Sequence, residues 1–349
     1  MLKRIAVVML GAVIGSVSVS VAQEDVLTVI AHDSFAYSEA VLEAFTAETG
    51  IAVEVIRLGD AGSLVNQAVL SRSNPLGDVL FGVDNTFLSR AIDGEIFVPY
   101  ESPLLETVDA SFIVDEEFRV TPINYGDVCL NYDVSYFDVA EVDLPETLDA
   151  LTDPSYSGLL VVENPATSSP GLAFLMTTIA VYGEEGDYTY LDFWSDLRAN
   201  DVYVADDWTE AYYAQFSGST GEGTRPLVVS YASSPPAEVY YSETPTEDAP
   251  TDSIVGEGMC FRQIEFAGIL AGTDQEAEAQ QFIDFMLSVP FQEDLPLNMF
   301  VFPVNSEAVL PEVFEEYAPI PENPITLDYT EIGENRERWL EEWTVTVIR

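Results

Sequence analysis

Short β-rich runs alternate with helical runs near the start of the chain, and this alternation restricts the fold more than any other feature of the sequence. The predicted strands cover residues 27–31, 51–58 and 78–83, and the predicted helices cover residues 38–50 and 62–73. Strands that are connected through helices lie parallel in a sheet, and the helices cover its faces. The chain is therefore predicted to have an α/β fold.

A second set of alternating elements follows residue 130. Its predicted strands cover residues 158–163, 201–205 and 225–231, and its predicted helices cover residues 170–182 and 208–216. A Pro-rich acidic loop is expected at 243–252, and a helix at 273–289 that opens with a capping box from Thr273 to Glu276. Two sets of elements predict two α/β lobes, with the chain passing between them more than once.

Polar and aromatic residues follow the predicted strands in both halves of the chain. The segments are HDSF (32–35), DN (84–85), NPATSSPG (164–171), DDW (206–208) and ASSPP (232–236). Each segment alone has the composition of an ordinary turn. Because ligands of open α/β sheets bind beyond the carboxyl ends of the strands, the recurrence predicts a ligand cleft between the lobes.

The segment around Ser168, Ser169 and Pro170 opens an apolar helical run. The N–H groups at a helix start carry partial positive charge, so this segment suits a polar or phosphate group of a ligand. Ordinary N-capping without a ligand is the alternative explanation.

The chain is strongly acidic, with 61 Asp and Glu residues, 12 Lys and Arg residues and a formal net charge of −49. This excludes a nucleic-acid partner, because phosphate binding needs clustered Lys and Arg. A cationic ligand fits the charge, and the candidate carboxylates and aromatic rings are Asp33, Asp84, Asp207, Trp208, Tyr231 and Phe300. A solvated acidic surface, as in a saline habitat, explains the same charge, and core packing is the alternative for Trp208.

Residues 1–22 have the features of a secretory signal peptide. Lys3 and Arg4 precede an apolar run at 5–14, and small residues at 20–22 mark a cleavage site. The mature protein is therefore expected to begin near Gln23 and to lie in the periplasm or another extracytoplasmic space.

Cys129 and Cys260 are the only cysteines, and His32 is the only histidine. In an oxidising compartment two cysteines favour one disulfide, and two separate buried thiols are the alternative. No common catalytic motif is present, and the adjacent Asp206 and Asp207 leave a strand in different directions, which is unsuitable for a hydrolase pair. We therefore expect no catalytic residue, no metal site and no cofactor.

The order of several segments resembles a known family. TVIAHDSFA (28–36), DVLFGVDN (78–85), TSSPGL (167–172) and LVVSYASSP (227–235) are similar to segments of the periplasmic thiamine-binding proteins of bacterial ABC importers. The resemblance implies a two-lobed, type II periplasmic-binding-protein-like fold, with parallel-rich sheets flanked by helices and the ligand cleft between the lobes.

The resemblance also implies how the chain is divided. Lobe 1 is expected to contain residues 23–126 and about 265–315, and lobe 2 residues 127–264, with the lobe of the C-terminal helical segment 316–349 left open. Cys129 and Cys260 lie near the expected crossings between the lobes, so the disulfide is predicted to join neighbouring hinge strands.

The family holds a thiamine cation by aromatic stacking and acidic contacts, with hydroxyl groups near the polar end of the ligand. Together with the residues named from the strand ends, the implied ligand-binding set is His32, Asp33, Ser34, Asp84, Asn85, Tyr125, Ser168, Ser169, Pro170, Asp207, Trp208, Tyr231 and Phe300. The chain departs from the family where an aromatic residue is expected, with His32, Glu39 and Ala237 in those places. The aromatic part of the site is therefore expected to be reduced.

The expected function is capture of thiamine, or of a thiamine phosphate, by a monomer that delivers it to a membrane ABC permease. The first alternative is a binder of another small cation, either a polyamine or a ferric ion. The paired tyrosines at 212–213 and 240–241 are similar to the iron ligands of ferric-binding relatives, although packing or surface positions explain them as well. A secreted hydrolase with two carboxylates is the second alternative.

Overall fold

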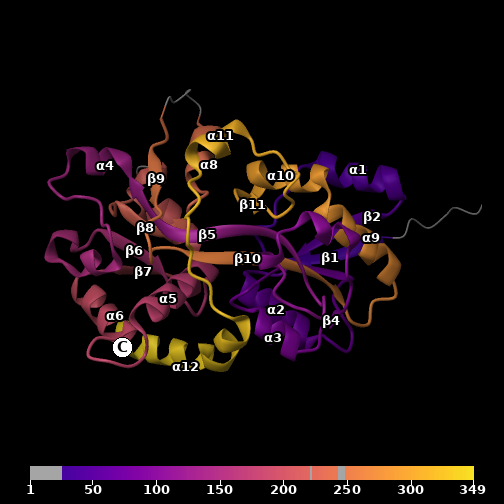
Figure 1. Cartoon of the computed structure of the whole chain (residues 1–349), viewed down its shortest axis with the longest axis horizontal. Coiled ribbons are helices and arrows are strands. Elements are labelled where there is room, and N and C mark those ends of the chain that lie inside the picture. Colours follow the sequence, from indigo (N-terminus) through magenta and orange to yellow (C-terminus); the bar gives the residue numbers. More distant parts are fainter. Residues whose placement is uncertain (1–25, 221, 243–247) are drawn as a thin grey trace, which may run out of the picture.

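The computed structural model describes residues 26–220, 222–242 and 248–349, so the predicted signal peptide at 1–22 lies outside the described residues. Within them, eleven strands form one connected sheet with helices on its faces (Figure 1). The main path of the sheet is β2 (Ala52–Arg57), β1 (Val26–Ala31), β3 (Val79–Asp84), β10 (Phe261–Leu270), β5 (Thr121–Asp133), β8 (Leu227–Tyr231), β6 (Leu160–Glu163) and β7 (Tyr203–Ala205). Three short strands attach to this path: β4 (Phe97–Val98) pairs with β10, and β9 (Thr251–Ile254) and β11 (Phe302–Pro303) pair with β5.

Twelve α-helices are found in the described part of the chain. They are α1 (Glu39–Thr49), α2 (Ala61–Leu70), α3 (Leu88–Asp93), α4 (Val134–Val139), α5 (Ser169–Tyr182), α6 (Tyr190–Ala199), α7 (Ser217–Thr220), α8 (Pro235–Tyr240), α9 (Glu276–Leu287), α10 (Val289–Met299), α11 (Glu312–Tyr317) and α12 (Tyr329–Val347). Short 3-10 helices cover Pro103–Thr107, Ala110–Phe112, Leu148–Thr152 and Pro154–Tyr156, and a π-helix covers Glu210–Gln215. None of the helices in these described segments is both long and apolar enough to span a membrane.

Parallel pairing is found at the two ends of the sheet, and antiparallel strands connect them. β1 pairs in parallel with β2 and β3, and β6 pairs in parallel with β7 and β8. Between these groups, β10 runs antiparallel to β3 and β5, and β5 runs antiparallel to β8. The first part of β5 pairs with β10 and its second part pairs with β8, so this one strand links both parallel groups.

Two separate hydrophobic cores flank this linkage. The first core packs Phe45 of α1 and Phe282 of α9 against β1 and β3. The second core packs Phe174 of α5 and Trp194 of α6 with Trp343 of α12. The C-terminal helix α12, whose lobe the sequence leaves open, lies beside α6 (Figure 1). Its apolar side chains therefore contribute to the second core.

The helix α12 also touches the first half of the molecule. The Arg336 guanidinium donates a hydrogen bond to the Thr86 carbonyl, with a distance of 3.0 Å. Gly333 lies against α3 so closely that a Cβ atom there would be 2.5 Å from the side chain of Ser89. A larger residue at 333 would therefore push α12 away from α3.

Local signals explain some helix ends and fail at others. The Ser38 hydroxyl accepts from the Val41 N–H at the start of α1, and Gly50 ends this helix in the left-handed conformation with φ of 78°. The predicted capping box at Thr273 is wrong, because α9 begins later and the Thr273 hydroxyl donates to the Asp78 carboxylate at 2.6 Å. The Thr273 oxygen accepts the Gln275 N–H at 3.0 Å, so it does not accept the Glu276 N–H as a capping box requires.

Two other predicted segments differ in detail. The helix expected at 208–216 is present as the π-helix Glu210–Gln215. The acidic loop expected at 243–252 is only partly described, since 243–247 lie outside the described residues and β9 begins at Thr251.

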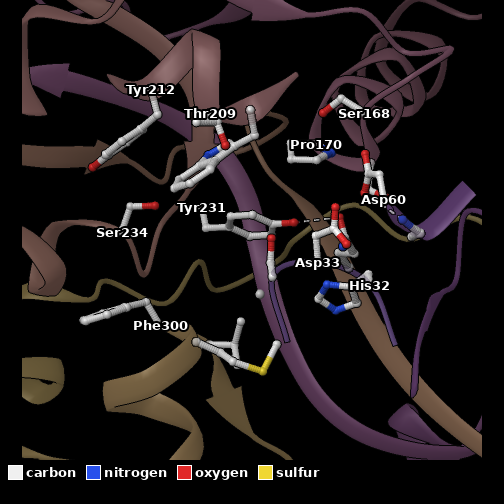
Figure 2. Close-up of a pocket in the computed structure, with 18 of the residues that line it drawn as sticks. His32, Asp33, Asp60, Ser168, Pro170, Thr209, Tyr212, Tyr231, Ser234 and Phe300 are labelled. Carbon is white, nitrogen blue, oxygen red and sulfur yellow. Dashed lines mark hydrogen bonds between the residues drawn. The ribbon is translucent and has the colours of Figure 1, made fainter. Parts of the chain in front are cut away.

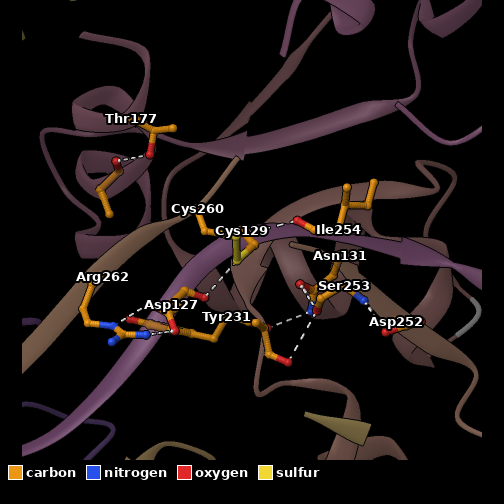
Figure 3. Close-up of a disulfide and its surroundings, with 12 residues drawn as sticks. Asp127, Cys129, Asn131, Thr177, Tyr231, Asp252, Ser253, Ile254, Cys260 and Arg262 are labelled. Carbon is orange, nitrogen blue, oxygen red and sulfur yellow. Dashed lines mark hydrogen bonds and ion pairs between the residues drawn. A yellow bond between two sulfur atoms is a disulfide. The ribbon is translucent and has the colours of Figure 1, made fainter. Parts of the chain in front are cut away.

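A disulfide connects β5 with the residue that directly precedes β10. Cys129 in β5 and Cys260, which directly precedes β10, have their sulfur atoms 2.12 Å apart (Figure 3). Nearby on the same strands, the Arg262 guanidinium donates two hydrogen bonds to the Asp127 carboxylate, at 2.8 and 2.7 Å. The crossing between the two cores is therefore held by a covalent bond and a bidentate ion pair.

Candidate functional site

A cavity of about 440 Å³ lies where the two cores meet. Its wall receives residues from the loop after β1, the start of α2, β5, β10 and the start of α5. The segment around the π-helix, the end of β8 and the connection from α10 to β11 complete the wall. Both cores therefore contribute side chains, as a ligand cleft between two lobes requires.

Aromatic rings form one part of the wall. In Figure 2, Tyr212 and Phe300 lie on one side of the view, His32, Asp33 and Asp60 lie on the other, and Tyr231 lies between them. The Trp208 ring also lines the cavity and stacks on Tyr212, with centroids 4.9 Å apart and an interplanar angle of 17°. Its indole N–H donates to the Ser230 hydroxyl at 2.9 Å, which fixes the ring in one orientation.

Phe300 is held in an unusual backbone conformation. It ends α10 with φ of 54° and ψ of 48°, in the left-handed region that side chains other than glycine rarely adopt. The Ser233 hydroxyl donates to the Phe300 carbonyl at 2.7 Å and so ties this turn to the segment after β8. Strain of this kind is typical of ligand sites, where it fixes the direction of a side chain.

Four carboxylates also line the cavity. Three of them accept backbone N–H groups: Asp33 from Gly59 at 3.0 Å, Asp60 from Ala61 at 2.7 Å and Asp207 from Glu210 at 2.8 Å. The fourth, Glu265, accepts from the Asn124 amide at 2.9 Å. These bonds orient carboxylates that remain open to the cavity.

His32 and Glu265 form an ion pair in this wall, with His32 Nε2 and Glu265 Oε1 separated by 3.1 Å. Burial opposes both charges, but the Coulombic attraction between the two groups outweighs it. The pKa of His32 is therefore raised and the pKa of Glu265 lowered. Gly82 makes room for the ring, because a Cβ atom at this position would overlap His32, and φ of 96° there also favours glycine.

The start of α5 faces a buried carboxylate. The Ser169 hydroxyl donates to Asp84 at the end of β3, with a distance of 2.9 Å, and this bond joins the two cores. Burial raises the pKa of Asp84 to about 6, against the opposing effect of hydrogen bonds from Thr86 and Ser169. The neighbouring Ser168 also lines the cavity, and its buried hydroxyl oxygen has no hydrogen-bond partner among the described residues.

Most of the residues named from the sequence meet at this cavity. The lining residues among them are His32, Asp33, Ser34, Ser168, Ser169, Pro170, Asp207, Trp208, Tyr231 and Phe300. Asp84, Asn85 and Tyr125 lie behind the wall instead. Asn85 bonds to the backbone of Arg262 and Ile264, and Tyr125 is stacked on Phe112 and Phe302.

Other lining residues were not named from the sequence. They include Asp60, Asn124, Tyr212, Ser234, Gln263, Glu265 and Met299. Asp60 follows the predicted strand 51–58, so the strand-end rule applied to that strand would have found it. Gln263 and Glu265 alternate along β10 with apolar residues, which indicates one polar face on a central strand, whereas no local signal marks Met299.

Comparison with known proteins relates this chain to solute-binding proteins. Residues 74–330 match the family described as bacterial extracellular solute-binding protein. Over 339 aligned residues the chain is 29% identical to the thiamine-binding periplasmic protein of Salmonella typhimurium, covering 93% of this chain and 94% of that protein. A solved structure of a periplasmic thiamin binding protein is similar with a TM-score of 0.79 and 26% identity, covering 94% of this chain and 98% of that one. The iron uptake protein A1 of Synechocystis sp. is 25% identical over 299 residues, with 81% of this chain and 77% of that protein covered.

Proposed function

Because the chain belongs to the family of bacterial extracellular solute-binding proteins, we propose that it captures thiamine, or a thiamine phosphate, and delivers it to the permease of a membrane ABC transporter. The fold is the two-lobed, type II fold of periplasmic binding proteins. One observation carries the choice of ligand: the described wall of the cavity combines aromatic rings with four carboxylates and has neither lysine nor arginine.

The chemistry of thiamine matches this wall. Its thiazolium ring is a permanent cation, and a cation over an aromatic face gains about 0.5–2 kcal/mol. Trp208, Tyr231 and Phe300 offer such faces, and Asp33, Asp60 and Asp207 offer negative charge. A volume of about 440 Å³ is in the range of pockets that enclose a small organic ligand.

The two lobes would close over the ligand, and the closed form would be what the permease recognises. We place lobe 1 at residues 23–126 and about 265–315, and lobe 2 at 127–264, with α12 packed mainly on lobe 2. The Ser169–Asp84 hydrogen bond crosses the cleft between them and would form part of the closed contact. The protein would act as a monomer in the periplasm, after export by the segment 1–22, and would leave its ligand chemically unchanged.

A ferric ion is the alternative ligand, because one relative of the chain is named as an iron uptake protein. Paired tyrosines bind ferric ion as tyrosinates, so their pKa must fall. The Tyr212 hydroxyl instead donates to Glu238 at 2.8 Å, and burial raises its pKa well above the usual value. This hydrogen bond already engages one phenol of the pair, and the described residues contain no group of three or more His, Cys, Asp or Glu side chains that could hold a metal ion, which supports an organic cation.

Isothermal titration calorimetry with the purified mature protein tests the proposal. Thiamine should bind with a dissociation constant of about 1 μM or less, which corresponds to about −8 kcal/mol. Spermidine and ferric citrate serve as the competing ligands. Heat from either of these, combined with no heat from thiamine, would assign the protein to another small cation.

A further inference from the structure

We infer that the cavity selects the unphosphorylated thiamine cation over thiamine monophosphate and thiamine diphosphate. The inference rests on the proposed function and narrows its ligand. It follows from the charges of the wall, from the groups at the start of α5, and from the positions of the arginines.

The wall gives a phosphate group no opposite charge. The four carboxylates Asp33, Asp60, Asp207 and Glu265 outnumber the one basic side chain, His32, which is already paired with Glu265. The cavity therefore attracts a cation and repels an added anion, and salt can screen this repulsion because Asp33, Asp60 and Asp207 are exposed.

The start of α5 would be the natural place for a phosphate, since helix N-termini attract anions. In this protein a carboxylate of the chain already faces it. Asp84 is buried and accepts the Ser169 hydroxyl at 2.9 Å, as well as the Thr86 N–H at 2.7 Å. A phosphate at this end of the cavity would lie close to the Asp84 carboxylate. The Ser169 hydroxyl could not donate to that phosphate, because it already donates to Asp84.

The unpartnered hydroxyl at the same end suits a neutral group. Ser168 is 1% exposed, lines the cavity and has a hydroxyl oxygen without a partner in the described residues. The free hydroxyethyl group of thiamine can both donate to and accept from such a hydroxyl. Esterification would replace that neutral partner by a charged one.

The basic residues near the cavity are engaged elsewhere. Lys3 is the only lysine in the sequence and lies outside the described residues. Arg262 forms the bidentate pair with Asp127, and Arg336 donates to the Thr86 carbonyl. Arg57 donates to the Phe35 carbonyl at 2.7 Å. None of these arginines lines the cavity, so closure over a phosphate ester would enclose its charge without a partner.

Calorimetric titration of the mature protein with thiamine and with thiamine monophosphate, at low and at high salt, tests this inference. The monophosphate should bind at least tenfold more weakly at low salt, and the difference should shrink at high salt as the charges are screened. Asp84→Asn removes the charge that faces α5 and should reduce the ratio of the two dissociation constants roughly fivefold. Glu43→Gln removes one charge from the exposed face of α1 and should leave the ratio unchanged.

Asp207→Asn gives the same test from the cavity wall should Asp84→Asn fail to fold, because an asparagine oxygen can still accept the Glu210 N–H. Equal or tighter binding of the monophosphate would overturn the inference while supporting thiamine-type binding. A ratio that falls equally in Glu43→Gln would also overturn it, since the effect would then come from the total charge. Binding of neither compound would overturn the proposed function and this inference with it.

Discussion

Replacing Trp208 tests whether its ring binds the ligand or only packs against its neighbours. The ring lines the cavity, is stacked on Tyr212, and donates its indole N–H to Ser230. Trp208→Ala would remove a cation–π contact worth about 0.5–2 kcal/mol, which corresponds to about a twofold to thirtyfold rise in the dissociation constant for thiamine. Trp208→Phe keeps an aromatic face and should raise that constant less.

The hydrogen bond to Ser230 supplies a separate stability effect. Both Trp208 variants lose it, which should lower the free energy of unfolding by about 0.5–1.5 kcal/mol. Trp194→Phe is the matched control, because Trp194 is buried in the second core and donates its N–H to Thr178 at 3.0 Å. Titration calorimetry and thermal unfolding should show a stability loss in all three variants, with weaker binding only in the Trp208 variants. An unchanged dissociation constant in Trp208→Ala, together with a lower melting temperature, would refute the role of Trp208 in binding.

Three further predictions concern Ser168, the disulfide between Cys129 and Cys260, and Asp84. Ser168→Ala should weaken thiamine binding in calorimetry by about 0.5–1.5 kcal/mol with little change in melting temperature, whereas a capping role would lower the melting temperature alone. Thiol titration of the unfolded, unreduced protein should find no reactive group, and replacing Cys129 and Cys260 together by serine should lower the free energy of unfolding by about 2–5 kcal/mol in denaturant titrations. Because the pKa of Asp84 is about 6 in the folded protein against 3.8 ordinarily, its contribution to the free energy of unfolding should fall as pH rises from about 4 to 6, by up to about 3 kcal/mol. Asp84→Asn should remove that slope in denaturant titrations at each pH, and an equal slope in variant and parent would contradict the assignment.

The α/β alternation was predictable because each predicted strand and helix carries its own local pattern. Ser38 and Gly50 are examples, since both act on α1 through neighbouring backbone groups. Most of the residues that the sequence names at strand ends line the cavity, because the carboxyl ends of parallel strands meet at one edge of a sheet. These signals need no knowledge of distant partners.

The length and register of β5 could not be predicted, because its buried polar residues find partners far along the chain. Asp127 pairs with Arg262, Asn124 donates to Glu265, and Asn131 donates to the Tyr231 carbonyl. Without those partners, each polar residue looks like part of a loop. The same reason explains Asp84, which the sequence places in the cleft and which the structure turns toward Ser169, behind the cavity wall.

Competition measured by native mass spectrometry tests the central claim most directly. The mature protein is unfolded to release any bound compound, refolded, and incubated with equal concentrations of thiamine, spermidine and ferric citrate. The proposed function predicts one dominant complex whose added mass is that of a single thiamine cation. A dominant complex with spermidine or iron would contradict it, as would a spectrum of unliganded protein alone.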